Sequence, residues 1–153
     1  DDTKLLERFL RYYLSIQDFE KDPLESDDLY QTFYKFYNFK LRYQKPEDII
    51  KHIYQYSKYF MMLVTNDFHG DIAEYVKRIN DLDVEKAYPF LMEVTEDYEK
   101  QLVTPEIFCE ILKTIEMFIL NHMQSQAEYS AQSFLELSKN ISKMLISGNM
   151  TSS

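Results

Sequence analysis

Residues that form turns are scarce in this sequence. Two glycines and four prolines occur among its 153 residues, whereas β-sandwiches and β-barrels need many turn residues. An all-β fold is therefore not expected. The apolar share of 45% is that of an ordinary globular protein, so wholesale disorder is not expected either. What remains is a domain of helices with few, short connections, at a length typical of one domain.

Cysteine, long apolar runs and targeting signals are also lacking. Cys109 is the single cysteine, which excludes an intrachain disulfide framework and indicates a reducing compartment. No run of about 18 apolar residues is present, so no membrane span is expected. The N-terminus lacks the basic and apolar segments of a signal peptide, and we expect a cytoplasmic protein. The first residue is Asp1 rather than methionine, which suggests a part of a longer protein.

Positive charge is in the minority, since 17 basic and 26 acidic residues give a net charge of −9. An acidic surface repels phosphate backbones, so nucleic-acid binding would need a local basic patch. One acid-free segment, residues 29–45 (LYQTFYKFYNFKLRYQK), has this character. Its basic residues are Lys35, Lys40, Arg42 and Lys45. They are interleaved with tyrosines, and proteins hold nucleic acid with cations on phosphates and rings on bases.

An aromatic core helix whose lysines face water would give the same pattern. The basic residues of the segment do not share one tight helical face, which favours this second interpretation. We therefore expect at most weak, salt-sensitive DNA binding by residues 29–45.

Apolar residues recur at helical spacing in about seven segments. These are residues 3–18, 29–43, 46–63, 72–79, 84–98, 105–123 and 127–147. Ser26 and Asp83 are expected N-caps, Pro46 is expected at the first position of its helix, and Thr104-Pro105-Glu106 is the clearest helix start. Gly148 is expected to end the last helix. The sequence predicts an all-α fold: one compact bundle over residues 1–147, followed by a disordered tail, 148–153.

Pro89 interrupts the fifth of these helical patterns. If that helix begins near Val84, the proline lies in its second turn, where its ring crowds the carbonyl of Glu85 and no N–H is donated. We expect a bend near residue 89, or a 3₁₀ turn before it and a regular helix after it. Tyr88 is also biased away from helical angles. Tyr88 and Pro89 are therefore predicted as a structural hinge. The bend could expose a carbonyl to a cleft, but packing of nearby aromatic rings into the core is the favoured interpretation.

No catalytic or metal-binding motif emerges. Four acids crowd one predicted helix: Glu93, Glu96, Asp97 and Glu99. They surround an apolar stripe, as on a solvated face, whereas acid–base catalysis needs a converging pair in a pocket. Asp48 and His52 could touch across one turn, but one such pair is no metal site. Cys109 borders an apolar face and is expected to be structural. We assign no catalytic, cofactor-binding or metal-binding residue.

Several short segments of the sequence resemble segments of a known protein family. These are LDV…AYPFL at residues 82–91, Asp97-Tyr98-Glu99, the aromatic-rich helix after Thr104, and upstream LERFLRYYLSI and LYQTFYKFY. Over roughly residues 5–120 the chain resembles the helical middle region of GmrSD-type proteins. That large bacterial family joins a ParB-like N-terminal domain to an HNH-type nuclease domain and restricts foreign or modified DNA. The match weakens after Phe118.

The resemblance implies that the chemistry lies in the flanking domains. The family's Asp-Gly-Gln-Gln-Arg motif is absent here, and His52, His69 and His122 cannot supply its His-Asn-His spacing. The implied function is a noncatalytic helical connector that positions a nucleotide-sensing domain and a nuclease domain, which are its partners. The alternative is a free-standing helical module that binds a protein partner or self-associates through tyrosines and methionines.

Overall fold

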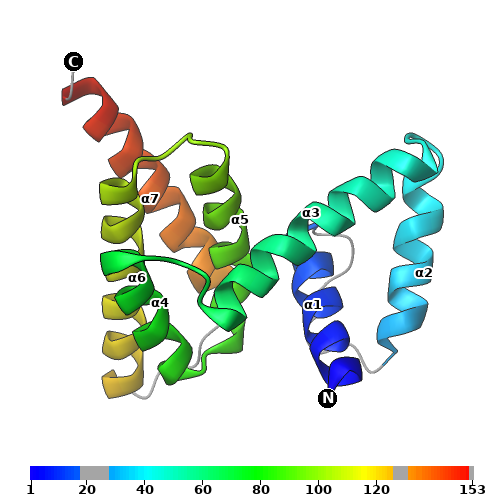
Figure 1. The fold of residues 1–153 in the computed structure, drawn as a ribbon, viewed down its shortest axis with the longest axis horizontal. Coiled ribbons are helices and arrows are strands. Elements are labelled where there is room, and N and C mark those ends of the chain that lie inside the picture. The colour runs from blue at the N-terminus through cyan, green and yellow to red at the C-terminus, as the bar shows by residue number, and fades with distance from the viewer. Residues whose placement is uncertain (18–27, 126–130, 152–153) are drawn as a thin grey trace.

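The computed structural model describes residues 1–17, 28–125 and 131–151, and all regular structure in these ranges is helical. The elements are α1 (Asp2–Ile16), α2 (Leu29–Lys40), α3 (Pro46–Thr65), α4 (Gly70–Leu82), the 3₁₀ turn η2 (Glu85–Ala87), α5 (Tyr88–Glu99), α6 (Pro105–Ser125) and α7 (Ala131–Thr151). The prediction of an all-α bundle of about seven helices is confirmed (Figure 1).

Helix α3 links the side of the molecule that contains α1 and α2 to the side that contains α4–α7 (Figure 1). It begins beside the end of α2 at one edge and ends beside α4 (Figure 1). Helix α1 packs against α2, α3 and α5, while α5 also packs against α3, α6 and α7, and α4 packs against α6. Buried residues of all seven helices form one apolar cluster, from Phe9 in α1 to Ile141 in α7. The described residues therefore share a single core.

Aromatic rings fill the centre of this core. The ring of Tyr12 lies parallel to that of Tyr88, with centroids 5.4 Å apart, and Phe60 meets Tyr12 edge-on at 5.9 Å. The guanidinium of Arg8 lies 5.7 Å from the centroid of Tyr88, within the range of a cation–π interaction. The phenol of Tyr88 donates to Asn80, whose amide donates to the carbonyl of Leu63. Tyr88 is thus held by α1, α3 and α4.

The region of Pro89 adopts the second of the two expected arrangements. The 3₁₀ turn Glu85–Ala87 leads directly into α5, so Pro89 is the second residue of the helix. Its missing N–H falls in the first turn, where a helix has no internal acceptor. Tyr88 is helical, with φ −65° and ψ −40°, contrary to the expected bias. Its burial, together with that of Phe90, agrees with the interpretation that this junction directs aromatic rings into the core.

Two helix starts were predicted correctly. Pro46 is the first residue of α3, and the Thr104 side chain accepts from the backbone N–H of Ile107 at 3.2 Å, just before Pro105 opens α6. Asp28 caps α2 by accepting from the N–H of Gln31 at 3.1 Å. The predicted cap, Ser26, lies outside the described residues.

Three predicted helix boundaries were wrong, one start and two ends. Asp83 ends α4 in the left-handed region at φ 53° and does not cap α5, because aspartate tolerates that conformation as well as an N-cap position. Helix α7 passes through Gly148 to Thr151, since one glycine costs a helix only about 1 kcal/mol. Helix α2 ends at Lys40, after which the N–H groups of Arg42 and Tyr43 bond three residues back.

Candidate functional site

Helix α2 lies at one edge of the molecule (Figure 1), and the residues along its outer side are exposed. It buries Leu29, Thr32 and Phe36 toward the bundle. The exposed rings on α2 and the following turn are Tyr30 (53% exposed), Tyr34 (63%), Phe39 (42%) and Tyr43 (74%). Large rings gathered on one exposed segment are typical of contact surfaces, so this face is a candidate interface.

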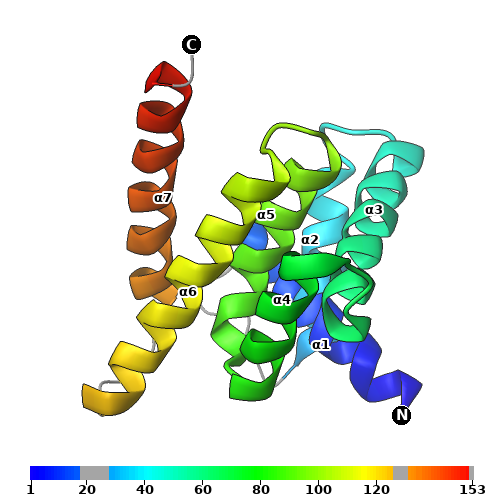
Figure 2. The same ribbon diagram turned by 60° about the vertical axis from the view of Figure 1, so that its left-hand side comes forward.

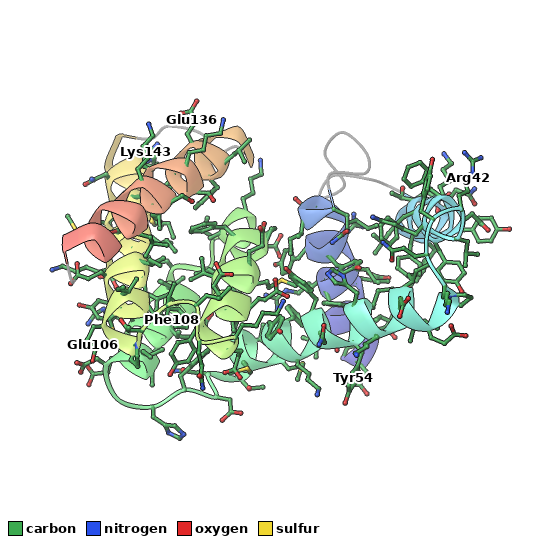
Figure 3. All side chains as sticks on the ribbon, turned by 90° about the horizontal axis from the view of Figure 1, so that it is seen from above. Arg42, Tyr54, Glu106, Phe108, Glu136 and Lys143 are labelled. Atoms are coloured by element: carbon green, nitrogen blue, oxygen red, sulfur yellow. The ribbon has the colours of Figure 1, made fainter. Side chains whose placement is uncertain are left out.

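A shallow groove of about 310 Å³ runs along this face, and we call it the α2 groove. Its lining residues are Gln31, Tyr34, Lys35, Asn38, Phe39 and Arg42. Figure 3 shows Arg42 on the side of α2 that faces away from α1. The groove thus combines two cations, two aromatic rings and two amides, and it contains no acid.

The four basic residues predicted as one patch are divided by the structure. Lys35 and Arg42 line the α2 groove. Lys40 lies on another face, with its Nζ 5.8 Å from the ring centroid of Phe36, because five residues at about 100° each turn a side chain well around the helix. Lys45 is the residue before α3 and is exposed. Only Lys35 and Arg42 are brought together, and DNA binding by them stays a prediction.

A second concave site, which we call the α1–α3 cavity, has a volume of about 250 Å³. It lies among α1, α2 and α3, and its lining residues are Tyr13, Gln17, Phe36, Lys40, Gln44, Asp48, Ile49 and His52. Asp48 and His52 both line it, as their spacing in the sequence allowed. The cavity therefore collects one cation, one carboxylate, two amides and an imidazole over an aromatic and aliphatic floor.

His52 is fixed by a residue distant in the sequence. Its Nδ1 lies 2.7 Å from the phenol oxygen of Tyr13. Tyr13 is 1% exposed, and burial raises the pKa of its phenol, so the hydroxyl keeps its proton and donates to Nδ1. Burial lowers the pKa of His52. A neutral imidazole with its proton on Nε2 satisfies both observations.

Sequence reasoning missed Tyr13 as a partner of His52. The two residues are 39 positions apart, and no local pattern relates them, so only the packing of α1 on α3 reveals the contact.

The acids of α5 do not all lie on an open solvated face. Tyr56 donates to Glu96 at 3.2 Å, and the Lys100 ammonium lies 3.3 Å from the other oxygen of Glu96. Partial burial, followed by the nearby Glu96 carboxylate, raises the pKa of Asp97. Desolvation, then Asp97 and Glu96, raises the pKa of Glu93, although Glu93 as a whole is exposed. None of these acids lines either of the two concave sites described above.

Cys109 is half-buried in α6. Burial, and then the acids Asp71, Glu106 and Glu110, raise the pKa of its thiol. A raised pKa disfavours the reactive thiolate, as expected for a structural cysteine.

Within the described ranges, no group of three or more histidines, cysteines and acids is arranged to hold a metal ion. None of the helices described is both long and apolar enough to cross a membrane.

Comparison with protein-family models, curated proteins and solved structures finds no match to this chain. The resemblance to GmrSD-type proteins consequently rests on the short sequence segments given above alone.

Proposed function

We propose that this chain is a noncatalytic helical connector that holds two flanking domains in a fixed relation. By the sequence resemblance, those domains are a nucleotide-sensing domain and a nuclease of a DNA-restriction-related protein. The observation that carries the proposal is the single continuous core, which joins helices whose chain ends lie far apart (Figures 1 and 2). A connector needs rigidity between separated attachment points.

The packing around α3 supports this rigidity. Its 20 residues span about 30 Å at the usual helical rise, and both ends are anchored, with Ile49 2% and Leu63 1% exposed. The stack of Tyr12 on Tyr88 fastens α1 to α5 across the middle of the molecule. A displacement of one side of such a close-packed bundle is transmitted to the other side rather than absorbed.

An activity assay tests the noncatalytic part of the proposal. We expect the isolated chain neither to cleave DNA with magnesium or manganese nor to hydrolyse nucleoside triphosphates. Metal-dependent cleavage or hydrolysis that co-purifies with the chain, and that changes when its own residues are substituted, would contradict it.

A second candidate function, a module that self-associates or binds a protein partner, is favoured by the exposed rings of α2. Light scattering over a range of concentrations tests it. A compact dimer that Tyr34→Ser weakens, while Tyr54→Ser on α3 does not, would support this function. A monomer at every concentration would exclude self-association.

A further inference from the structure

We propose that the α1–α3 cavity binds a small zwitterion of the α-amino acid class. The proposal does not rest on the connector function, because it is argued from the residues that line the cavity. Its chemistry follows from three features: the signs of the charges in its lining, the neutrality of its interior and its size.

Lys40 and Asp48 are the two charged residues in the lining, at the end of α2 and in the first turn of α3. Among the described residues, no ion pair joins them. A cavity that presents one cation and one carboxylate, not paired with each other, complements a ligand with one anion and one cation. The carboxylate and ammonium of an α-amino acid meet this requirement through charge-assisted hydrogen bonds to Lys40 and Asp48.

The inner wall carries no net charge. Tyr13 and Phe36 are each 1% exposed, and the phenol of Tyr13 is engaged with Nδ1 of His52 at 2.7 Å. This contact leaves the protonated Nε2 of His52 as a neutral donor. An ionised group placed here would lose its hydration without a counter-charge. Because Tyr13 and Phe36 are almost fully covered, the accessible neutral lining consists of Gln17, Gln44 and His52. This lining suits an uncharged polar side chain of the ligand.

Size and charge argue against other ligand classes. The volume of about 250 Å³ lies below the range of about 300–1,000 Å³ that is typical of sites for drug-sized molecules, which favours a smaller ligand than a nucleotide. A free phosphate would meet the single cation Lys40 but also the carboxylate of Asp48. An apolar molecule would leave the amides and both charges without partners.

An NMR titration of the intact chain tests the proposal. The probes are glutamine, leucine and phenylalanine, each followed at millimolar concentration through the ring resonances of His52. We expect a saturable shift with at least one of them, largest for glutamine. The N-acetyl amide of the same amino acid has neither charge and should produce no shift.

Variants identify the two charged contacts. Lys40→Met and Asp48→Asn should each weaken binding about tenfold, the loss of one charge-assisted hydrogen bond. Lys58→Met removes an exposed lysine of the same helix bundle, outside the cavity, and should bind as the unmodified chain does. Absence of a shift with all three amino acids, an equal shift with the blocked derivatives, or an equal loss in Lys58→Met would each overturn the proposal.

Discussion

Tyr88 shows most directly how one residue holds the elements of this protein together. It is 3% exposed, stacks on Tyr12, lies under the Arg8 guanidinium and donates to Asn80. The sequence marked Tyr88 because a proline follows it, but it gave no sign of the three partners, which come from helices α1 and α4.

Removal of the Tyr88 ring should therefore destabilise the fold severely. We expect Tyr88→Ala to lower the free energy of unfolding by about 3–5 kcal/mol, as for other buried aromatic residues. Tyr88→Phe keeps the stack and loses the hydroxyl with its hydrogen bond to Asn80, so it should cost about 1 kcal/mol. Urea denaturation measures both. Tyr54→Ala, at a residue 59% exposed on α3, is the control, and an equal loss in this variant would contradict the account.

His52 should make stability depend on pH. Its pKa is lowered by burial in the folded chain, whereas the unfolded value is about 6.5. The unfolded state therefore binds the proton more readily, and stability is lost as the pH falls below about 6.5 toward the folded pKa. Asp97, whose pKa is raised by partial burial and by Glu96, contributes in the opposite direction.

Comparison with His52→Gln isolates the histidine, because glutamine can still accept from Tyr13 without titrating. We expect the stability advantage of the unmodified chain over this variant to shrink as the pH is lowered from about 7 to about 5. Thermal or urea unfolding at each pH measures it. An advantage that is constant over this interval would show that the contact does not restrict protonation.

At the scale of the element, local signals predicted two helix starts correctly, whereas one predicted start and two predicted ends were wrong. Pro46 and Thr104-Pro105 open helices as expected, because each satisfies a requirement of the first turn by itself. The prediction of Asp83 as an N-cap was wrong because aspartate occurs at both ends of helices, and here it ends α4. The extent of α7 past Gly148 was missed because glycine weakens a helix without breaking it.

Helix α2 and the turn after it carry the exposed aromatic and basic surface described above. The structure reduces the predicted four-residue patch to Lys35 and Arg42, which line the α2 groove with Tyr34 and Phe39. The sequence correctly indicated that the four cations do not share one face. The spacing of seven residues between Lys35 and Arg42 is about two helical turns and is consistent with their lying on one side. The groove that they line could not be predicted, because it includes the turn after the end of α2 at Lys40.

Any DNA binding by the chain should depend on these two cations. In fluorescence anisotropy at low salt, Lys35→Glu/Arg42→Glu should abolish weak binding to labelled DNA, and the salt dependence should correspond to about two phosphate contacts. Lys51→Glu/Lys58→Glu is a matched control, with the same spacing of seven residues on the exposed face of α3. Equal binding by the α2 variant, or an equal loss in the α3 control, would exclude the groove as the site.

At the scale of the whole molecule, the all-helical class followed from the scarcity of glycine and proline, and the structure confirms it. The order in which helices pack did not follow, because the pairing of α1 with α5 joins segments some 75 residues apart, such as Tyr12 and Tyr88. The single core that results is the basis of the proposed connector.

A rigid connector should hold its two sides at one distance. With Cys109→Ser as background, spin labels at Lys4 on α1 and Lys143 on α7, both exposed, should give one narrow distance distribution by pulsed electron paramagnetic resonance. Labels at Lys4 on α1 and Lys58 on α3 provide the control, because they measure a distance within one side of the molecule. A broad or bimodal distribution for Lys4 and Lys143 alone would indicate that the two sides move independently.

The connector proposal is tested most directly by sequencing the native reading frame on both sides of this segment. The proposal predicts an upstream Asp-Gly-Gln-Gln-Arg motif and a downstream His-Asn-His motif in the same frame. A start codon immediately before Asp1 and a stop codon immediately after Ser153 would contradict it, and the module that binds a partner would then be the better account.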